Sequence, residues 1–281
     1  MLKQRLITAV VALPILIAAV WFAPWFTVLA TLVGALGAIE FYRLVAKAKV
    51  PPISFFGVAI VVLFVLSGDA GIQAMIEPYF DPAQAPLIIF TAAAILPLIW
   101  LVISAPKTES FARWAWTLAG AVYVGWLLSY LVALRGVEGG RNWVFFALLT
   151  TFASDSAAYF FGRARGRTKL APAISPAKTW EGAVAGAVAA LIISLVFLPG
   201  NFFGVSNPLY LSELTVASAL LLGCLVSVFG QCGDLIESLF KRNMNAKDSG
   251  VLFPGHGGVL DRVDSVVFAG IVVYYFVWLT R

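Results

Sequence analysis

Apolar residues in this chain of 281 amino acids form long runs, separated by short polar or proline-containing linkers. A helix needs about 20 residues to cross the hydrocarbon core of a bilayer. Nine runs reach or approach that length, and they cover residues 6–23, 26–46, 53–68, 86–104, 114–134, 143–162, 180–198, 212–232 and 264–280. The third run is short, and the second carries an acid, Glu40, near its end. The pattern predicts an all-α, polytopic integral membrane protein with about nine transmembrane helices.

The composition excludes a soluble globular protein. Hydrophobic residues make up 61% of the chain and charged residues 12%, whereas soluble domains carry about 25% charged residues. The first apolar run follows a short basic segment, as in a signal peptide, but no small-residue cleavage site follows it and the second run begins at once. We therefore expect it to be retained as the first transmembrane helix. A nucleic-acid partner is not expected, because the basic residues are scattered over short linkers.

The distribution of basic residues predicts how these spans are oriented. If the N-terminus lies in the cytoplasm, sixteen of the 19 Lys and Arg residues fall on the cytoplasmic side, in agreement with the positive-inside rule. The basic residues on the other side are Arg135, Arg141 and Arg281. The linkers on that side instead carry the acids Asp69, Glu77, Asp81 and Glu213. The C-terminus is then expected outside, and the polar stretch 238–264 and the basic loop 163–179 both face the cytoplasm.

The densest group of charges lies between Ser238 and Asp264, directly before the last apolar run. This stretch contains the only histidine of the chain, His256, with glycines on both sides. The segment DLIESLFKR, residues 234–242, has helical amphipathicity and predicts an interfacial helix that continues from the eighth span. The residues that follow it are rich in Gly, Pro and Asn and predict a loop. Because the chain has so few charges elsewhere, we expect its chemistry in this stretch.

Aspartates lie inside or at the ends of several predicted spans, at Asp155, Asp234, Asp261 and Asp264. Ionisable residues at membrane depth are costly and are candidate functional residues. The i, i+3 spacing of Asp261 and Asp264 places both carboxylates on one face of a helix. With Asp234 nearby, that face could hold a hard divalent cation such as Mg²⁺. The alternative is that these are ordinary helix-terminal carboxylates paired with Arg262 or Lys241.

Basic and hydroxyl side chains that could bind phosphate accompany these acids. They are Lys241, Arg242, Lys247 and Arg262 in the polar stretch, and Ser175, Lys178 and Thr179 in the segment SPAKTWEG. A divalent cation with basic residues around flexible glycines suits phosphoryl or nucleotidyl transfer, which depends mainly on positioning and on neutralising developing charge. The alternative is positive charge that only sets topology. His256 could be a base, a phosphate ligand or a structural residue. We favour phosphate or nucleotide contact, since an attacking phosphate oxygen is already ionised at neutral pH.

Three spaced motifs in the C-terminal half resemble those of the phosphatidate cytidylyltransferase (CDP-diacylglycerol synthase) family. The longest is Ser238-x-x-Lys241-Arg242-x4-Lys247-Asp248-x-Gly250, followed by Pro254-x-His256-Gly257-Gly258-x-x-Asp261-Arg262-x-Asp264. The others are Asp155-x-x-Ala158-Tyr159-Phe160-x-Gly162-Arg163, and Lys169-Leu170 with Ser175-Pro176-x-Lys178-Thr179-x-Glu181-Gly182. The resemblance covers residues 150–264; the first five spans match in hydropathy and topology. The sequence departs from the family pattern at Ala177, commonly a second Lys, and at Ser156-Ala157.

The resemblance implies that CTP and phosphatidate react to give CDP-diacylglycerol and pyrophosphate, with Mg²⁺ and a possible second, monovalent cation as cofactors. It implies that Asp234 and Asp261 hold the metal, with Asp264 beside them, and that Lys241 and Arg242 belong to the catalytic group. The residues it implies for substrate binding are Asp155, Ser175, Lys178, Thr179, Glu181, Lys247, Asp248, His256, Gly257, Gly258 and Arg262. It also implies a homodimer in the cell inner (plasma) membrane, with the active site facing the cytoplasm.

On this basis we expect two regions. Residues 1–140 would form N-terminal membrane helices for dimerisation and lipid access, and residues 141–281 a catalytic membrane domain with cytoplasmic loops 163–179 and 233–263. The main alternative function is a cation- or proton-coupled transporter that uses the intramembrane acids. It predicts acids near the bilayer midplane on broken helices, whereas these acids cluster at one edge beside basic residues. Among other lipid phosphotransferases, the CDP-alcohol type is disfavoured because its DGxxAR-type motif is absent.

Overall fold

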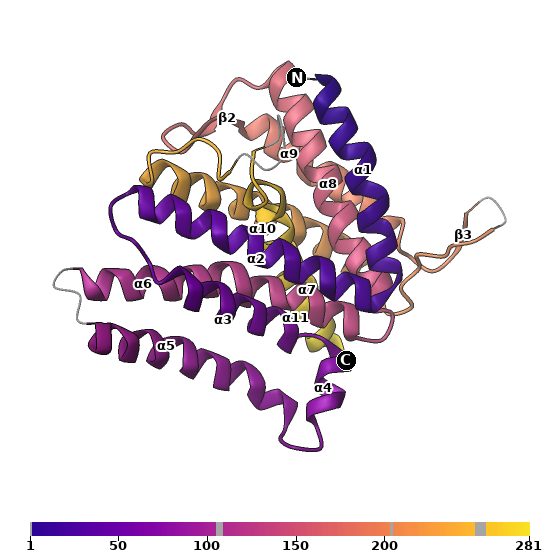
Figure 1. Ribbon diagram of the computed structural model, residues 1–281. Helices are drawn as coiled ribbons and strands as arrows, with labels where there is room; N and C mark the ends of the chain where they lie inside the picture. Colours follow the sequence, from indigo (N-terminus) through magenta and orange to yellow (C-terminus); the bar gives the residue numbers. More distant parts are fainter. Residues whose placement is uncertain (1, 105–108, 203–204, 251–256) are drawn as a thin grey trace. The chain divides into compact units, whose positions relative to one another are not determined.

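The computed structural model describes residues 2–104, 109–202, 205–250 and 257–281, and most of them are helical (Figure 1). The helices are α1 (Leu2–Trp21), α2 (Ala23–Lys47), α3 (Ser54–Ser67), α4 (Ala70–Ile76), η1 (Pro82–Gln84), α5 (Ala85–Ser104), α6 (Ser110–Gly120), η2 (Ala121–Trp126), α7 (Leu127–Gly136), α8 (Gly140–Arg165), α9 (Trp180–Leu195), α10 (Val216–Asn243) and α11 (Leu260–Thr280). The strands are β1 (Lys169–Ala171), β2 (Ser175–Thr179), β3 (Asn201–Phe202) and β4 (Val205–Ser206).

Every apolar run of the sequence coincides with helix, but not every helix is long enough to cross a bilayer. Among the described residues, six segments pass by length and composition, namely α2, η1 with α5, the continuous α6–η2–α7, α8, α10 and α11. Helices α3 and α4 are bent by 91° and would make a seventh span if counted together. The apolar helices Val10–Trp21 and Trp180–Leu195 are shorter. The multi-pass helical architecture is thus confirmed, while the count of nine and the orientation of the termini stay predictions.

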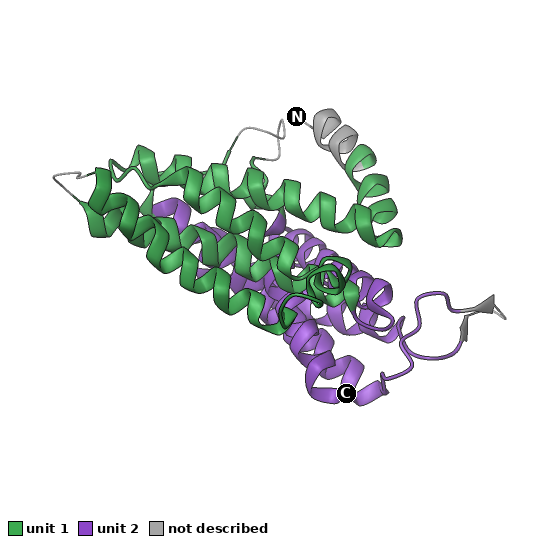
Figure 2. Cartoon of the chain, turned by 60° about the horizontal axis from the view of Figure 1, so that its bottom comes forward, with its two compact units in different colours: residues 1–136, 243–262 green, residues 137–242, 263–281 purple. Residues whose placement is uncertain are grey.

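The chain forms two compact units (Figure 2). Unit 1 comprises residues 1–136 and 243–262, and unit 2 comprises residues 137–242 and 263–281. The units divide at residue 136, and residues 243–262 group with the N-terminal helices. The functional regions 1–140 and 141–281 stay predictions. The boundary crosses two continuous helices, because α10 ends at Asn243 in unit 1 and α11 begins there at Leu260.

Unit 1 is packed through small residues that let its helices approach closely. A Cβ at Gly34 of α2 would lie 3.3 Å from the Val61 side chain of α3. The ring of Tyr42 fills the space beside Gly57 and Gly120, and its hydroxyl donates a hydrogen bond to the Thr117 carbonyl at 2.7 Å. These contacts hold α2, α3 and α6 side by side, so the end of α2 that carries Glu40 has a defined position.

In unit 2, small residues likewise let α8 and α9 approach closely. Cβ atoms at Gly182 and Gly186 of α9 would lie 2.7 Å from the Ala158 carbonyl oxygen and 2.9 Å from that of Ser154, both in α8. The Gly-x-x-x-Gly spacing repeats the contact after one helical turn. In turn, α10 approaches α9 at Gly223, where a Cβ would lie 2.8 Å from the Ser194 hydroxyl.

Two short hairpins lie outside the helices, so the all-α prediction is correct for the membrane segments but not for every connection. Strands β1 and β2 pair antiparallel, with Lys169 opposite Thr179 and Ala171 opposite Ser175. They occupy part of the segment predicted as a basic loop, because α8 continues to Arg165 and the remaining residues fold back before α9. Strands β3 and β4 form the second antiparallel pair. The prediction of a helix over residues 234–242 is confirmed, since α10 runs without a break to Asn243.

Candidate functional site

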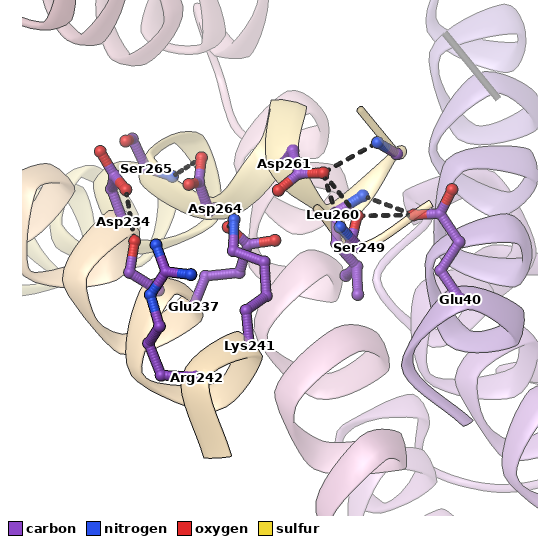
Figure 3. Close-up of polar contacts among 12 residues, drawn as sticks. Glu40, Asp234, Glu237, Lys241, Arg242, Ser249, Leu260, Asp261, Asp264 and Ser265 are labelled. Atoms are coloured by element: carbon purple, nitrogen blue, oxygen red, sulfur yellow. Dashed lines mark hydrogen bonds and ion pairs between the residues drawn. The ribbon is translucent and has the colours of Figure 1, made fainter. Parts of the chain in front are cut away.

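Helices α10 and α11 approach each other closely in unit 2 beside two of the predicted aspartates. Gly233 makes it possible, because a Cβ there would lie 2.5 Å from the Asp264 carbonyl oxygen and 2.6 Å from the Phe268 ring. Asp234 follows this glycine directly, so its carboxylate and that of Asp264 belong to the same helix crossing (Figure 3). Asp264 accepts a hydrogen bond from the Ser265 backbone N–H at 2.8 Å. Asp155 of α8 is near enough for its charge to act on Asp264.

Lys178 from strand β2 neutralises Asp234. Its Nζ lies 2.7 Å from Asp234 Oδ2, and the two side chains are 21% and 35% exposed. The same ammonium donates a 3.4 Å hydrogen bond to the Gln231 carbonyl, and the Ser238 hydroxyl lies 3.4 Å from the other Asp234 oxygen. The β1–β2 hairpin therefore places Lys178, a predicted phosphate ligand, against Asp234, a predicted metal ligand. The two residues are more than fifty positions apart in the sequence.

Lys241 has a different environment from the one expected. Its Nζ lies 2.6 Å from Glu237 Oε2, and the Glu237 side chain is fully buried. An exposed lysine could meet phosphate directly, but this one is engaged in a buried ion pair within α10. Sequence reasoning missed Glu237, although an acid four residues before a lysine on a helix is a recognisable pairing signal. The Arg242 side chain is exposed and donates a hydrogen bond from Nε to the Ile174 carbonyl at 3.3 Å, which ties the end of α10 to the hairpin.

Thr179 and Glu181 organise the start of α9. The buried Thr179 hydroxyl accepts the Gly182 N–H at 3.2 Å and so caps the helix. The Glu181 carboxylate accepts the backbone N–H groups of Arg167 at 3.1 Å and Thr168 at 3.1 and 3.2 Å. Hydrogen bonds from its own backbone N–H and from Arg167 and Thr168 lower the pKa of Glu181 from 4.5 to about 2. Both residues thus shape the hairpin that carries Ser175 and Lys178.

In unit 1, Asp261 is hydrogen-bonded to two described residues that precede α11, Ser249 and Gly258. Its Oδ2 accepts hydrogen bonds from the Ser249 N–H at 2.9 Å, the Ser249 hydroxyl at 2.8 Å and the Gly258 N–H at 2.8 Å. An acid in the first turn that reaches back to a preceding N–H acts as in a capping box. Gly257 has φ +81°, and a Cβ there would collide with the Asp261 carboxylate, so glycine is required on both counts. Sequence reasoning did not single out Ser249.

The remaining predicted residues between Lys247 and Arg262 differ in their exposure. Lys247, Asp248 and Arg262 are exposed in unit 1, and Gly258 is buried beside Ser249. His256 lies outside the described residues. The predicted site residues therefore form two groups. Unit 2 holds Asp155, Ser175, Lys178, Thr179, Glu181, Asp234, Lys241, Arg242 and Asp264, and unit 1 holds Lys247, Asp248, Gly257, Gly258, Asp261 and Arg262.

The carboxylates of unit 2 fit a metal that is shared with a substrate. Mg²⁺ is commonly held by one or two carboxylates together with substrate phosphates, and the α10–α11 crossing offers Asp234 and Asp264. Within the described part of the chain, no group of three or more His, Cys, Asp or Glu side chains is arranged to hold a metal ion. The donor set is thus too small for an all-protein cage but is adequate for a Mg²⁺–nucleotide complex.

Helices long enough to cross a membrane, together with carboxylates and cations clustered at helix ends, indicate a membrane protein with a site for a charged ligand. The chain belongs to the cytidylyltransferase family, whose model matches residues 3–280. It is 31% identical to the phosphatidate cytidylyltransferase of Bacillus subtilis, over 98% of this chain and 97% of that protein. It is 35% identical to the Staphylococcus haemolyticus protein of the same name, over 95% of each, and 42% identical to that of Brucella suis, over 68% of each. The transporter alternative finds no support in these relatives.

Proposed function

We propose that this protein is a phosphatidate cytidylyltransferase, which makes CDP-diacylglycerol and pyrophosphate from CTP and phosphatidate. Full-length relatives of that name support this function. The observation that carries it in the structure is the Lys178–Asp234 pair at the α10–α11 crossing. It combines a carboxylate that can hold a metal with a cation that can take a phosphate. Nucleotidyl transfer needs both, since its transition state spreads negative charge over phosphate oxygens.

In the proposed reaction, a phosphate oxygen of phosphatidate attacks the α-phosphorus of CTP. The new bond joins that oxygen to the α-phosphorus, the bond to the bridging oxygen of the β-phosphate breaks, and pyrophosphate leaves with the electron pair. No protein base is required, because the attacking oxygen is already ionised. Asp234 and Asp264 of unit 2 would hold magnesium, which would neutralise the phosphate charge, and Asp261 of unit 1 is proposed as a further metal ligand. The protein's own task is to orient the two phosphates in line and to exclude water from the α-phosphorus.

The basic residues of the site are proposed to have two roles: most of them bind substrate phosphate, and Lys241 supports the structure of α10. Lys178 lies against Asp234, and an incoming nucleotide phosphate would give its ammonium a second anionic partner at the same place. Arg242 at the end of α10, and Lys247 and Arg262 in unit 1, are exposed and can meet phosphate oxygens. Lys241 balances Glu237 and supports α10 from inside. We further propose a homodimer in the cell inner membrane, as the family resemblance implies. The distribution of basic residues supports an active site that faces the cytoplasm.

The function is tested with purified protein in phospholipid vesicles, labelled CTP and Mg²⁺. With phosphatidate present, we expect release of pyrophosphate and appearance of CDP-diacylglycerol in the lipid phase, in equal amounts. Diacylglycerol or a polyprenol in place of phosphatidate should yield no cytidine-containing lipid, and a chelator should stop the reaction. Asp234→Asn should abolish turnover, whereas Asp81→Asn, in an exposed linker, should not. Phosphorylation of an alcohol, or no product from phosphatidate, would overturn the proposal.

A further inference from the structure

Glu40 is an unusual residue in helix α2. Most of the helix is apolar, yet this acid near its end is 7% exposed. Removing a carboxylate from water is costly unless hydrogen-bond donors compensate for the lost hydration. The neighbours of Glu40 therefore indicate why an acid stands at this position. Ser249, Gly250, Gly258 and Leu260 lie beside it, and all four belong to unit 1.

Two donors converge on a single oxygen of Glu40, and both come from the far end of the sequence. Oε2 accepts the Ser249 hydroxyl at 3.0 Å and the Leu260 backbone N–H at 3.1 Å (Figure 3). Leu260 is the first residue of α11, where the N–H groups have no partner within the helix. One turn earlier on α2, a Cβ at Gly37 would lie 3.2 Å from the Leu260 side chain. Glu40 thus caps the start of α11 at the place where α2 packs against it.

Through Ser249, Glu40 is connected to Asp261. The Ser249 hydroxyl lies 3.0 Å from Glu40 Oε2 and 2.8 Å from Asp261 Oδ2. The hydroxyl has one hydrogen for two acceptors, so it donates to one carboxylate at a time. The Ser249 N–H also donates to Asp261, at 2.9 Å. The position of the Asp261 carboxylate is therefore determined by a serine whose hydroxyl contacts Glu40.

The Glu40 carboxylate explains why glycine stands at positions 250 and 258. A Cβ at Gly250 would collide with Glu40 Oε1, and one at Gly258 would collide with Glu40 Oε2 and the Ser249 hydroxyl. Neither glycine has a positive φ. Lack of space beside Glu40, rather than backbone conformation, therefore excludes larger residues there. Gly250 and Gly258 are thus packed directly against the buried acid.

We propose that Glu40 is a positioning residue for the transfer reaction: it holds Ser249 and the first turn of α11 so that Asp261 is presented in its reactive position. This proposal rests on the proposed function, and it assigns a role in the reaction to a helix that contributed no residue to the predicted site. Glu40 itself contacts neither substrate. Its effect passes through Ser249 and the α11 N-terminus.

The first test compares Glu40→Ala and Glu40→Gln in the vesicle assay. Because misplacing a reacting group by about 1 Å can cost roughly 100-fold in rate, we expect Glu40→Ala to lower kcat by that order at a temperature where the variant is fully folded, with little change in the KM for CTP. Glutamine keeps the shape and one carbonyl acceptor, so Glu40→Gln should recover much of the loss. The matched control is Glu77→Ala, at an exposed acid of the same unit. A kcat unchanged in Glu40→Ala, or lost only in step with Tm, overturns the proposal.

The second test uses the contact between Gly250 and Glu40. Gly250→Ala alone should lower kcat, because the added methyl displaces the Glu40 carboxylate. In the Glu40→Ala background the colliding atoms are gone, so Gly250→Ala should cause no further loss. Independent roles would instead multiply the two losses, and that result refutes the coupling. Hydrogen exchange at the Leu260 amide, which should accelerate in Glu40→Ala, provides a readout independent of turnover. An inactive wild-type protein would refute the proposed function, whereas an active wild type with a fully active Glu40→Ala would refute only the positioning role.

Discussion

Replacing Asp261 with asparagine separates two tasks that its carboxylate combines. One oxygen holds the loop, through hydrogen bonds from Ser249 N–H, the Ser249 hydroxyl and Gly258 N–H at 2.8–2.9 Å. The proposed second task is to provide negative charge for a metal. Asparagine has nearly the same shape and keeps a carbonyl oxygen that can accept these hydrogen bonds, but it has no charge. Alanine removes both tasks at once and cannot distinguish them.

The hydrogen bonds give the expected size of each effect. A hydrogen bond to a charged group contributes about 1.5–3 kcal/mol and one between neutral groups about 0.5–1.5 kcal/mol. Asp261→Asn should therefore weaken each of its bonds by about 1 kcal/mol and leave the loop in place. In Asp261→Ala the Ser249 hydroxyl can turn to Glu40, 3.0 Å away, but the N–H groups of Ser249 and Gly258 lose their acceptor. Each lost acceptor costs about 1–3 kcal/mol, which is enough to release the loop.

The assay combines pyrophosphate release with hydrogen exchange of the loop amides. We expect Asp261→Asn to lose at least about 100-fold in kcat, as for removal of an electrostatic stabiliser, while the amides of Ser249 and Gly258 stay protected. Asp261→Ala should lose both turnover and protection. The control is Asp81→Asn in an exposed linker, where asparagine caps a helical turn as well as aspartate. Turnover near the wild-type rate in Asp261→Asn would refute the requirement for charge and leave Asp261 a purely structural role.

Three further outcomes are expected. Lys178→Met should lower kcat/KM for CTP by about 10- to 100-fold. Lys178→Arg should lower it less, because arginine keeps a positive charge that can pair with Asp234. Equal losses in the two variants would contradict a charge role. Lys241→Met should destabilise the protein by about 3–5 kcal/mol, since it removes the ammonium that pairs with the buried Glu237 carboxylate. Glu237→Leu in the same chain should recover Tm, and an unchanged Tm in the single variant would argue against the buried pair. The pKa of Glu181 is lowered, so its carboxylate contributes its full stabilisation of the folded protein above pH 4.5. The Tm difference between wild type and Glu181→Gln should therefore shrink as the pH falls towards about 2. A difference independent of pH would contradict this assignment.

The helices could be predicted because the membrane imposes a local rule. Backbone polar groups in hydrocarbon must be paired within a helix, so an apolar run of sufficient length is enough to identify one. The aspartates and the Ser238–Asp264 stretch stood out for the same reason, as charge is rare in such a chain. The limits of the rule are visible at α3 and α9, which are helical but too short to pass as spans by length and composition. The β1–β2 hairpin was missed because a few polar residues give no clear periodicity.

The partners of those residues depend on packing that no local pattern records. Lys178 meets Asp234, and Glu40 meets Ser249 across 209 positions of sequence. Both contacts depend on how closely the chain packs, at Gly37 beside Leu260 and along the glycine faces of α8, α9 and α10. An acid within an apolar helix looks like an interruption when the chain is viewed residue by residue. Only the tertiary structure makes Glu40 a hydrogen-bond acceptor for Ser249 and Leu260, more than two hundred residues away. The packing that buries the Glu40 carboxylate also brings these two donors to it.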